Sequence, residues 1–437
     1  MIGRAADMVR PTPPEVVARR GPRGARPTKG LRRERHAMDH AVLISVVALA
    51  AIGIVMVYSS SAIRSYLQTD DTLAIVGPQI LWAALGMIAM LVMSRIDYRL
   101  LRLVSIPVYL GAVALLVLVL LPPIGPLEPR SIGGAARWLQ IGPLPAIHPA
   151  EFAKLALVIY VAHLLASRGT EIRSFWRGTL PFLLVAGTVI FLIFREPDLG
   201  TTIVVAATAL TMFFVAGANL LHLAILGLLG LGGVAAIGLR GYQLARIEAW
   251  LDPWADPLGA GFHTIQGLLA LGLGGLLGSG LGESRLAGGL YLPNAWNDFI
   301  FAVIGEELGF IGAGLVILLF LVLAYQGTRV AMAAPDTFGA LLAAGITAWL
   351  CIQAFVNIGV VVALFPVTGI TLPFVSAGGS SLIISFAAVG ILLSISRETV
   401  EQGSWNDAPA DRGRRNRRAH LPGPGRRPVA ERRAGSA

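Results

Sequence analysis

The sequence contains a single cysteine, Cys351, among 437 residues. A lone cysteine excludes an internal disulfide and a metal centre built from several thiolates. Charged residues are also scarce: Asp, Glu, Lys and Arg make up 14% of the chain, whereas a soluble globular domain has about 25%. Because 55% of the residues are hydrophobic, this scarcity excludes a soluble protein and indicates a polytopic membrane protein.

Three familiar signatures are missing from the sequence. Glycine-rich stretches occur, but none has the GxxxxGK[ST] pattern of a phosphate-binding loop, which argues against a nucleotide site. No His, Cys and acid spacing marks a zinc site. No internal repeat is evident, so the pattern typical of many secondary transporters is not seen.

The net charge of +10 is concentrated at the two ends of the chain. Residues 1–38 and 399–437 are rich in Arg, Pro and Gly, which predicts disordered basic tails. Basic flanks of hydrophobic spans indicate cytoplasmic retention rather than nucleic-acid binding. The first tail lacks the apolar core of a cleavable signal peptide, so we expect the first span to act as the insertion signal.

The region 39–398 is expected to be one all-α transmembrane domain of about ten helices. The hydrophobic segments are 40–61, 75–94, 100–121, 149–167, 178–194, 199–216, 219–239, 298–325, 338–363 and 379–396. An even number of spans places both termini on one side, and the arginines of the short loops make that side cytoplasmic. The segment 240–297, between helices 7 and 8, is then a long extracytoplasmic loop, and the motif-like segments 122–148, 195–198 and 364–378 face the same side.

Asp298 stands where this loop meets an apolar helix, and Glu306 and Glu307 follow inside that helix. An ionisable group at membrane depth costs roughly 3 kcal/mol or more, so a functional role is the default interpretation. The alternative is that Asp298 only caps the helix.

Other polar residues lie at the same predicted face. Glu151 and Lys154 project from one face of a helix that Pro149 begins, near Arg137 and Trp138 of the preceding loop. They are suited to an anionic head group, or form a local ion pair beside an interfacial tryptophan.

Two further polar segments also allow two interpretations, whereas a polar pair in a span allows one. Arg195, Glu196 and Asp198 form either a charged site or a salt-bridged turn that caps the next helix. The backbone N–H groups of 378–381 suit a phosphate or another outer loop, or the segment is a broken-helix packing motif. Gln353 and Asn357, on one helix face, are explained by interhelical hydrogen bonds.

The motifs together resemble the SEDS family (shape, elongation, division and sporulation), which includes RodA and FtsW. The matching segments, in the family's order, are Arg137-Trp138, Pro149-Ala-Glu-Phe-Ala-Lys154, Glu196-Pro-Asp-Leu-Gly200, Asp256-Pro-Leu-Gly-Ala-Gly261 with Gln266, Tyr291-Leu-Pro293, Asp298-Phe-Ile-Phe301, Glu306-Glu-Leu-Gly309, and Leu372-Pro-Phe374 with Gly378-Gly-Ser-Ser381. Four residues depart from the family pattern: Trp296-Asn297 in place of His-Thr, His148 in place of Gln, and Ala377 in place of Tyr.

The resemblance implies a peptidoglycan glycosyltransferase of the bacterial cytoplasmic membrane, closer to the division type than to the elongation type. Its implied partners are lipid II, a class B penicillin-binding protein and other membrane proteins of the division or elongation complex, with no nucleic acid. The resemblance implies that Asp298 is the essential catalytic residue. The expected substrate-binding residues are Arg137, Glu151, Lys154, Arg195, Glu196, Asp198, Gln266, Glu306, Glu307, Ser380 and Ser381.

We therefore expect inverting glycosyl transfer, with Asp298 as general base and Arg137, Lys154 and Arg195 offsetting charge on the departing pyrophosphate. Glu306 and Glu307 would place those cations or help hold a divalent ion (Mg²⁺ or Mn²⁺), and no cofactor is otherwise expected. The competing hypotheses are a lipid II flippase, an elongation-type polymerase and a non-catalytic scaffold.

Overall fold

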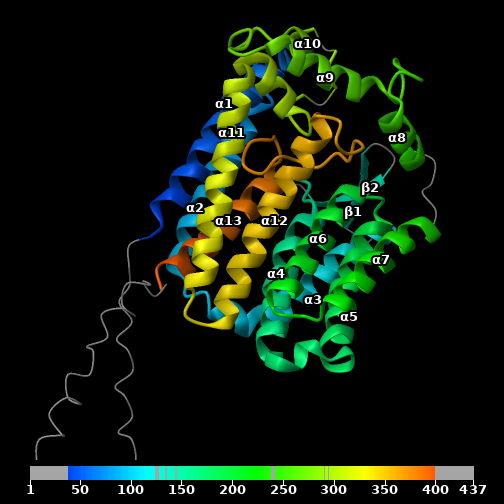
Figure 1. Ribbon diagram of the computed structural model, residues 1–437. Helices are drawn as coiled ribbons and strands as arrows, with labels where there is room; N and C mark the ends of the chain where they lie inside the picture. The colour runs from blue at the N-terminus through cyan, green and yellow to red at the C-terminus, as the bar shows by residue number, and fades with distance from the viewer. Residues whose placement is uncertain are drawn as a thin grey trace, which may run out of the picture. The chain divides into compact units, whose positions relative to one another are not determined.

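The computed structural model describes residues 38–123, 127–132, 135–142, 145–237, 242–289, 291–293 and 295–398. The two predicted tails therefore lie outside the described residues, apart from residue 38. The described chain is mainly helical (Figure 1). Its first helices are α1 (His40–Thr69), α2 (Val76–Arg95), α3 (Leu100–Leu120), α4 (Pro149–Arg168), α5 (Leu180–Arg195), α6 (Leu199–Val215) and α7 (Leu220–Ile237). Three short helices follow, α8 (Tyr242–Leu251), α9 (Phe262–Gly274) and α10 (Arg285–Gly288), and then α11 (Ile300–Ala333), α12 (Thr337–Val361) and α13 (Gly379–Ser396).

Each of the ten predicted spans coincides with a helix. Eight helical segments in the described residues are long and apolar enough to cross a membrane, and the two others, α6 and α7, are shorter in apolar length. The protein is thus a multi-pass membrane protein. The predicted loop 122–148 differs from the all-α expectation, because it contains an antiparallel pair of strands, β1 (Leu127–Ile132) and β2 (Ala135–Ile141).

The central helices are α4, α12 and α13, since 67% of the apolar window of each is buried, against 28% for α2 and α3. Helix α13 packs on α2, while α12 packs on α4, α6 and α11. The peripheral helices expose large apolar side chains, as expected where lipid is the solvent.

Helix α11 is broken near its start. Gly309 has φ 67° and ψ −167°, a conformation that only glycine adopts readily. The loop after α9 supplies the missing hydrogen bonds: Phe310 N donates to the carbonyl of Gly275, and Ser279 N donates to that of Glu306. A broken helix is tolerated at membrane depth when its backbone groups are satisfied in this way.

The short helices of the long loop lie at the end of the bundle where α1 ends and α11 begins (Figure 1). Helix α9 packs on α11, and α10 packs on α1. Helix α8 is tied to the segment after α12, because Trp250 Nε1 donates to the carbonyl of Ala363 over 2.9 Å. The loop is therefore a folded layer above the helix ends.

Candidate functional site

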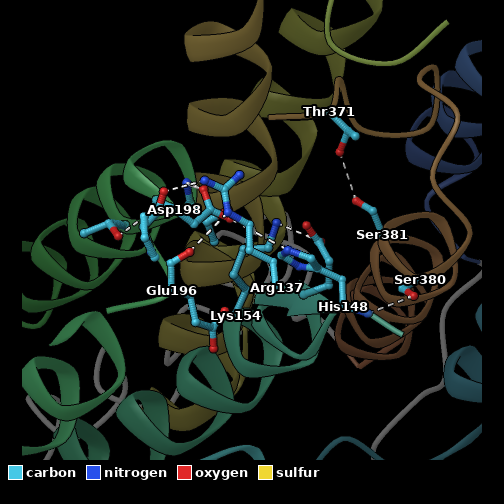
Figure 2. A network of polar contacts seen from close by, with 12 residues as sticks. Arg137, His148, Lys154, Glu196, Asp198, Thr371, Ser380 and Ser381 are labelled. Carbon is cyan, nitrogen blue, oxygen red and sulfur yellow. Dashed lines mark hydrogen bonds and ion pairs between the residues drawn. The ribbon is translucent and has the colours of Figure 1, made fainter. Parts of the chain in front are cut away.

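A cavity of about 330 Å³ lies where α4, α6 and α13 begin. It is lined by Arg137, Trp138, His148, Glu151, Asp198, Thr201, Arg246, Asn297, Asp298, Gly369, Ile370, Thr371, Ala377, Gly378, Ser380 and Ser381. The cavity thus gathers six of the predicted site residues, namely Arg137, Glu151, Asp198, Asp298, Ser380 and Ser381. They come from segments far apart in the sequence, and Figure 2 shows a network of polar contacts that includes Arg137, Asp198, Ser380 and Ser381.

The backbone around Asp298 is fixed by hydrogen bonds from two other segments. Asn357 Nδ2 donates to the carbonyls of Asp298 (2.9 Å) and Ile370 (2.8 Å). Ser376 Oγ donates to the carbonyl of Asn297 over 2.6 Å. Asn357 therefore joins the Asp298 segment to the loop after α12, rather than making the interhelical bond expected from the sequence.

The Asp298 side chain does not cap α11. The capping position is Phe299, which makes no side-chain capping bond. Burial raises the pKa of the Asp298 carboxyl to about 6, while a bond to the residue's own backbone and, to a smaller extent, the charge of Arg246 lower it. A carboxylate with this pKa is both ionised near neutral pH and basic enough to accept a proton from a bound hydroxyl.

Arg137 reaches across from β2 to the turn between α5 and α6. Its Nε donates to the carbonyl of Glu196 over 3.2 Å, and its Nη2 donates to that of Pro197. Glu196 itself is fully buried, and its carboxyl oxygens have no hydrogen-bond partner among the described residues. Burial and the nearby Asp198 raise the pKa of Glu196 to about 9, so it is neutral at pH 7.

Asp198 has the capping role that was one of its two interpretations. Its carboxylate accepts hydrogen bonds from Thr201 N (3.1 Å) and Thr201 Oγ1 (2.8 Å) at the start of α6. His148 Nε2 lies 3.8 Å from the same carboxylate, and burial lowers the pKa of this histidine despite the acid. Asp198 therefore combines a structural contact with a position in the cavity wall.

Lys154 lies beneath the cavity instead of lining it. Its Nζ is 2.8 Å from Glu151 Oε2 and donates to Gln353 Oε1 over 2.7 Å. Gln353 Nε2 donates in turn to the carbonyl of Thr371, whose hydroxyl contacts that of Ser381. The charge of Lys154 is offset by Glu151, and Gln353 of α12 connects this pair to Thr371 in the cavity wall.

The structure does not bring the remaining predicted residues to the cavity. Arg195 is exposed at the end of α5, and Gln266 on α9 has a buried carbonyl oxygen without a hydrogen-bond partner in the described chain. Glu306 accepts bonds from Ser284 Oγ (2.6 Å) and from the backbone N–H groups of residues 285 and 286. Glu307 accepts a bond from Ser59 of α1 over 2.6 Å.

These contacts leave Glu306 and Glu307 away from Arg137 and Lys154. Within the described segments, no group of three or more His, Cys, Asp and Glu side chains is arranged to hold a metal ion.

Among the Asp, Glu, Lys and Arg residues that line the cavity, Arg246 is the one that was not predicted as a site residue. Arg246 lies on α8, in the loop assigned to the outer face, and its Nη1 donates to the carbonyl of Val367 over 3.1 Å. Its location could have identified it from the sequence, because the positive-inside rule disfavours arginines in loops on the outer side of the membrane.

Fold and site together define a polytopic helical membrane protein with a cavity of acids and arginines at one end of its helices. The profile of the cell cycle protein family, FtsW, RodA and SpoVE, matches residues 39–401. The chain therefore belongs to this family.

Relatives and solved structures agree with this assignment. Stage V sporulation protein E of Bacillus subtilis is 44% identical over 360 residues, covering 82% of this chain and 97% of the relative. A probable peptidoglycan glycosyltransferase FtsW of a Geobacter species is 42% identical, covering 82% and 96%. A solved peptidoglycan synthase complex, described as coordinating polymerization and crosslinking, contains a chain of 31% identity and TM-score 0.66, with 83% of this chain and 98% of that chain covered. Thermus thermophilus RodA has 29% identity and TM-score 0.61, covering 84% and 98%.

Proposed function

We propose that the protein is a peptidoglycan glycosyltransferase that polymerises lipid II on the outer face of the bacterial cytoplasmic membrane. The observation that supports this most directly is Asp298, a carboxylate held in a cavity with Arg137 and Arg246. The names of the relatives and the family assignment support the same reaction class. Both tails would then lie in the cytoplasm, as the positive-inside rule predicts.

In the proposed reaction, Asp298 takes the proton from the 4-hydroxyl of the acceptor sugar. The oxygen attacks the anomeric carbon of the donor, a new glycosidic bond forms, and the bond to the phosphate oxygen breaks. Undecaprenyl pyrophosphate leaves with the bonding electrons. Arg137 is the cation proposed to offset its charge, which is the kind of electrostatic stabilisation that usually contributes most to such reactions.

A class B penicillin-binding protein is the proposed partner, because one structural relative is part of a peptidoglycan synthase complex. The division role is proposed over the elongation role on the sequence motifs. The flippase alternative requires polar groups through the membrane depth, whereas the acids and arginines of the described cavity gather at one end of the helices.

The experiment is lipid II polymerisation by the purified full-length protein in liposomes, with and without a class B penicillin-binding protein. Glycan strands from the wild-type protein support the proposal. Transfer of lipid II between leaflets without strand formation would replace it with the flippase. Absence of both activities in the folded protein would support the scaffold hypothesis.

A further inference from the structure

Arg246 is a charged residue of the cavity to which the proposed reaction assigns no role. It is carried by α8, which is attached to the segment after α12 at two points: Trp250 donates to the carbonyl of Ala363, and Arg246 donates to that of Val367. The guanidinium is therefore placed by a folded scaffold and not by a flexible surface loop.

The other acids of the cavity already have side-chain partners among the described residues. Glu151 pairs with Lys154 at 2.8 Å. Asp198 accepts two bonds from Thr201. The Asp298 carboxylate, by contrast, is influenced by burial, by its own backbone and by the charge of Arg246.

We propose that Arg246 is a positioning residue for the base: held by the carbonyl of Val367, its guanidinium keeps the Asp298 carboxylate ionised inside the cavity. This inference rests on the proposed function and deepens it. Burial alone favours the neutral acid, which cannot accept a proton, and a nearby positive charge counteracts that effect. Arg246 thus lets a poorly solvated carboxylate act as a base at neutral pH.

The pH dependence has a definite sign. Other titratable and charged groups lining the same cavity are Arg137 from β2, His148 and Glu151 at the start of α4, and Asp198 before α6. The base works when it is deprotonated, so activity is lost as the pH falls through its pKa. Removing Arg246 raises that pKa, and the loss then begins at a higher pH.

The test compares Arg246→Met and Arg246→Lys with the wild type, at saturating lipid II from pH 5 to 9. Arg285→Met is the matched control, because it removes an exposed arginine from the same loop. In Arg246→Met, we expect the low-pH fall of the pH–rate profile to move to higher pH by about one unit. Above pH 8 this variant should regain much of the wild-type rate. In Arg246→Lys and Arg285→Met, the rate should fall over the same pH range as in the wild type. A rate that falls by the same factor at every pH in Arg246→Met would overturn the proposal.

A second measurement is independent of turnover. Infrared titration of the Asp298 carboxyl, identified by its absence in Asp298→Asn, should give a higher pKa in Arg246→Met than in the wild type. An unchanged pKa overturns the role of Arg246 even if strands are made. A raised pKa without strand synthesis by the wild type upholds this inference while the proposed function fails, so the two failures are distinguishable.

Discussion

Two acidic regions lie close together in the sequence at the start of α11, and the surroundings of their carboxylates are opposite in character. Asp298 precedes the helix and faces a cavity, with no capping bond from its side chain to the helix. Glu306, about two helical turns later, is 1% exposed and accepts bonds from a serine hydroxyl and two backbone N–H groups. In the sequence both appear as carboxylates at the same predicted face.

The difference shows how a structural acid is distinguished from a candidate catalytic one. A buried carboxylate that has filled its hydrogen-bonding capacity stabilises the element that donates to it, here the start of α10. A carboxylate beside a cavity keeps capacity for a substrate proton. Removing the first kind of carboxylate should mainly lower stability, and removing the second kind should mainly lower the rate.

The largest expected effect is on the rate of Asp298→Asn. The amide keeps the shape of the side chain but cannot accept the proton, so polymerisation should fall by about 10²- to 10⁴-fold. Thermal stability should be unchanged or higher, because a poorly solvated charge is removed. Rate and melting temperature are measured on the same preparation, with the exposed Glu283→Gln as control. Full activity in the folded Asp298→Asn protein would contradict the role of the base.

Glu306→Ala should show the opposite pattern. It leaves Ser284 and two backbone N–H groups without their buried acceptor, which should cost about 2–4 kcal/mol of stability. Polymerisation per folded molecule should fall much less than in Asp298→Asn. Thermal unfolding in detergent measures the first effect, and activity corrected for the folded fraction measures the second. A stable Glu306→Ala protein without activity would place this acid in the catalytic machinery.

The wild-type rate should depend on pH in the way that the Asp298 cavity predicts. Since burial raises the pKa of Asp298 to about 6, polymerisation should be constant above pH 7 and fall roughly tenfold for each pH unit well below 6. The rate of Glu306→Ala should fall over the same pH range, because Glu306 does not line the cavity. Rates at saturating lipid II over pH 4.5 to 8 measure it. If the rate fell only near pH 4, Asp298 would be better solvated than its position in the cavity indicates.

The sequence predicts the helices well, because long apolar runs leave few alternatives in a membrane. It also predicts the cavity wall in part: Arg137, Glu151 and Asp198 occur in short polar segments between spans, and connections on one side of a membrane bring such segments together. Asp298 is identified by its position before a long apolar helix.

The sequence could not separate Glu306 from Asp298, because the groups that satisfy Glu306 lie in a glycine-rich loop with no evident pattern. The break at Gly309 is equally hidden, since glycines are frequent throughout the spans. Arg246 was not predicted because Val367, which accepts its hydrogen bond, lies more than a hundred residues further along the chain. These contacts depend on tertiary packing, which local patterns do not encode.

The smallest predicted effect concerns Ser59 on α1. Its hydroxyl donates to Glu307 over 2.6 Å and accepts a bond from Gly282 N over 3.1 Å, so it joins α1 to both the broken helix and the loop. Ser59→Ala should cost about 1–2 kcal/mol, less than Glu306→Ala, because Gly282 lies at an exposed position where water can replace the lost partner.

The control for this change is Ser167→Ala, which removes an exposed hydroxyl from the end of α4. Melting temperatures of the two variants give the stability difference, and strand synthesis at 25 °C should be unchanged in both. If Ser59→Ala abolished synthesis while its melting temperature stayed at the wild-type value, Glu307 would have a role in the reaction. The division between a satisfied acidic cluster and a reactive cavity would then be wrong, since a contact distant from the cavity would control turnover without contributing to stability.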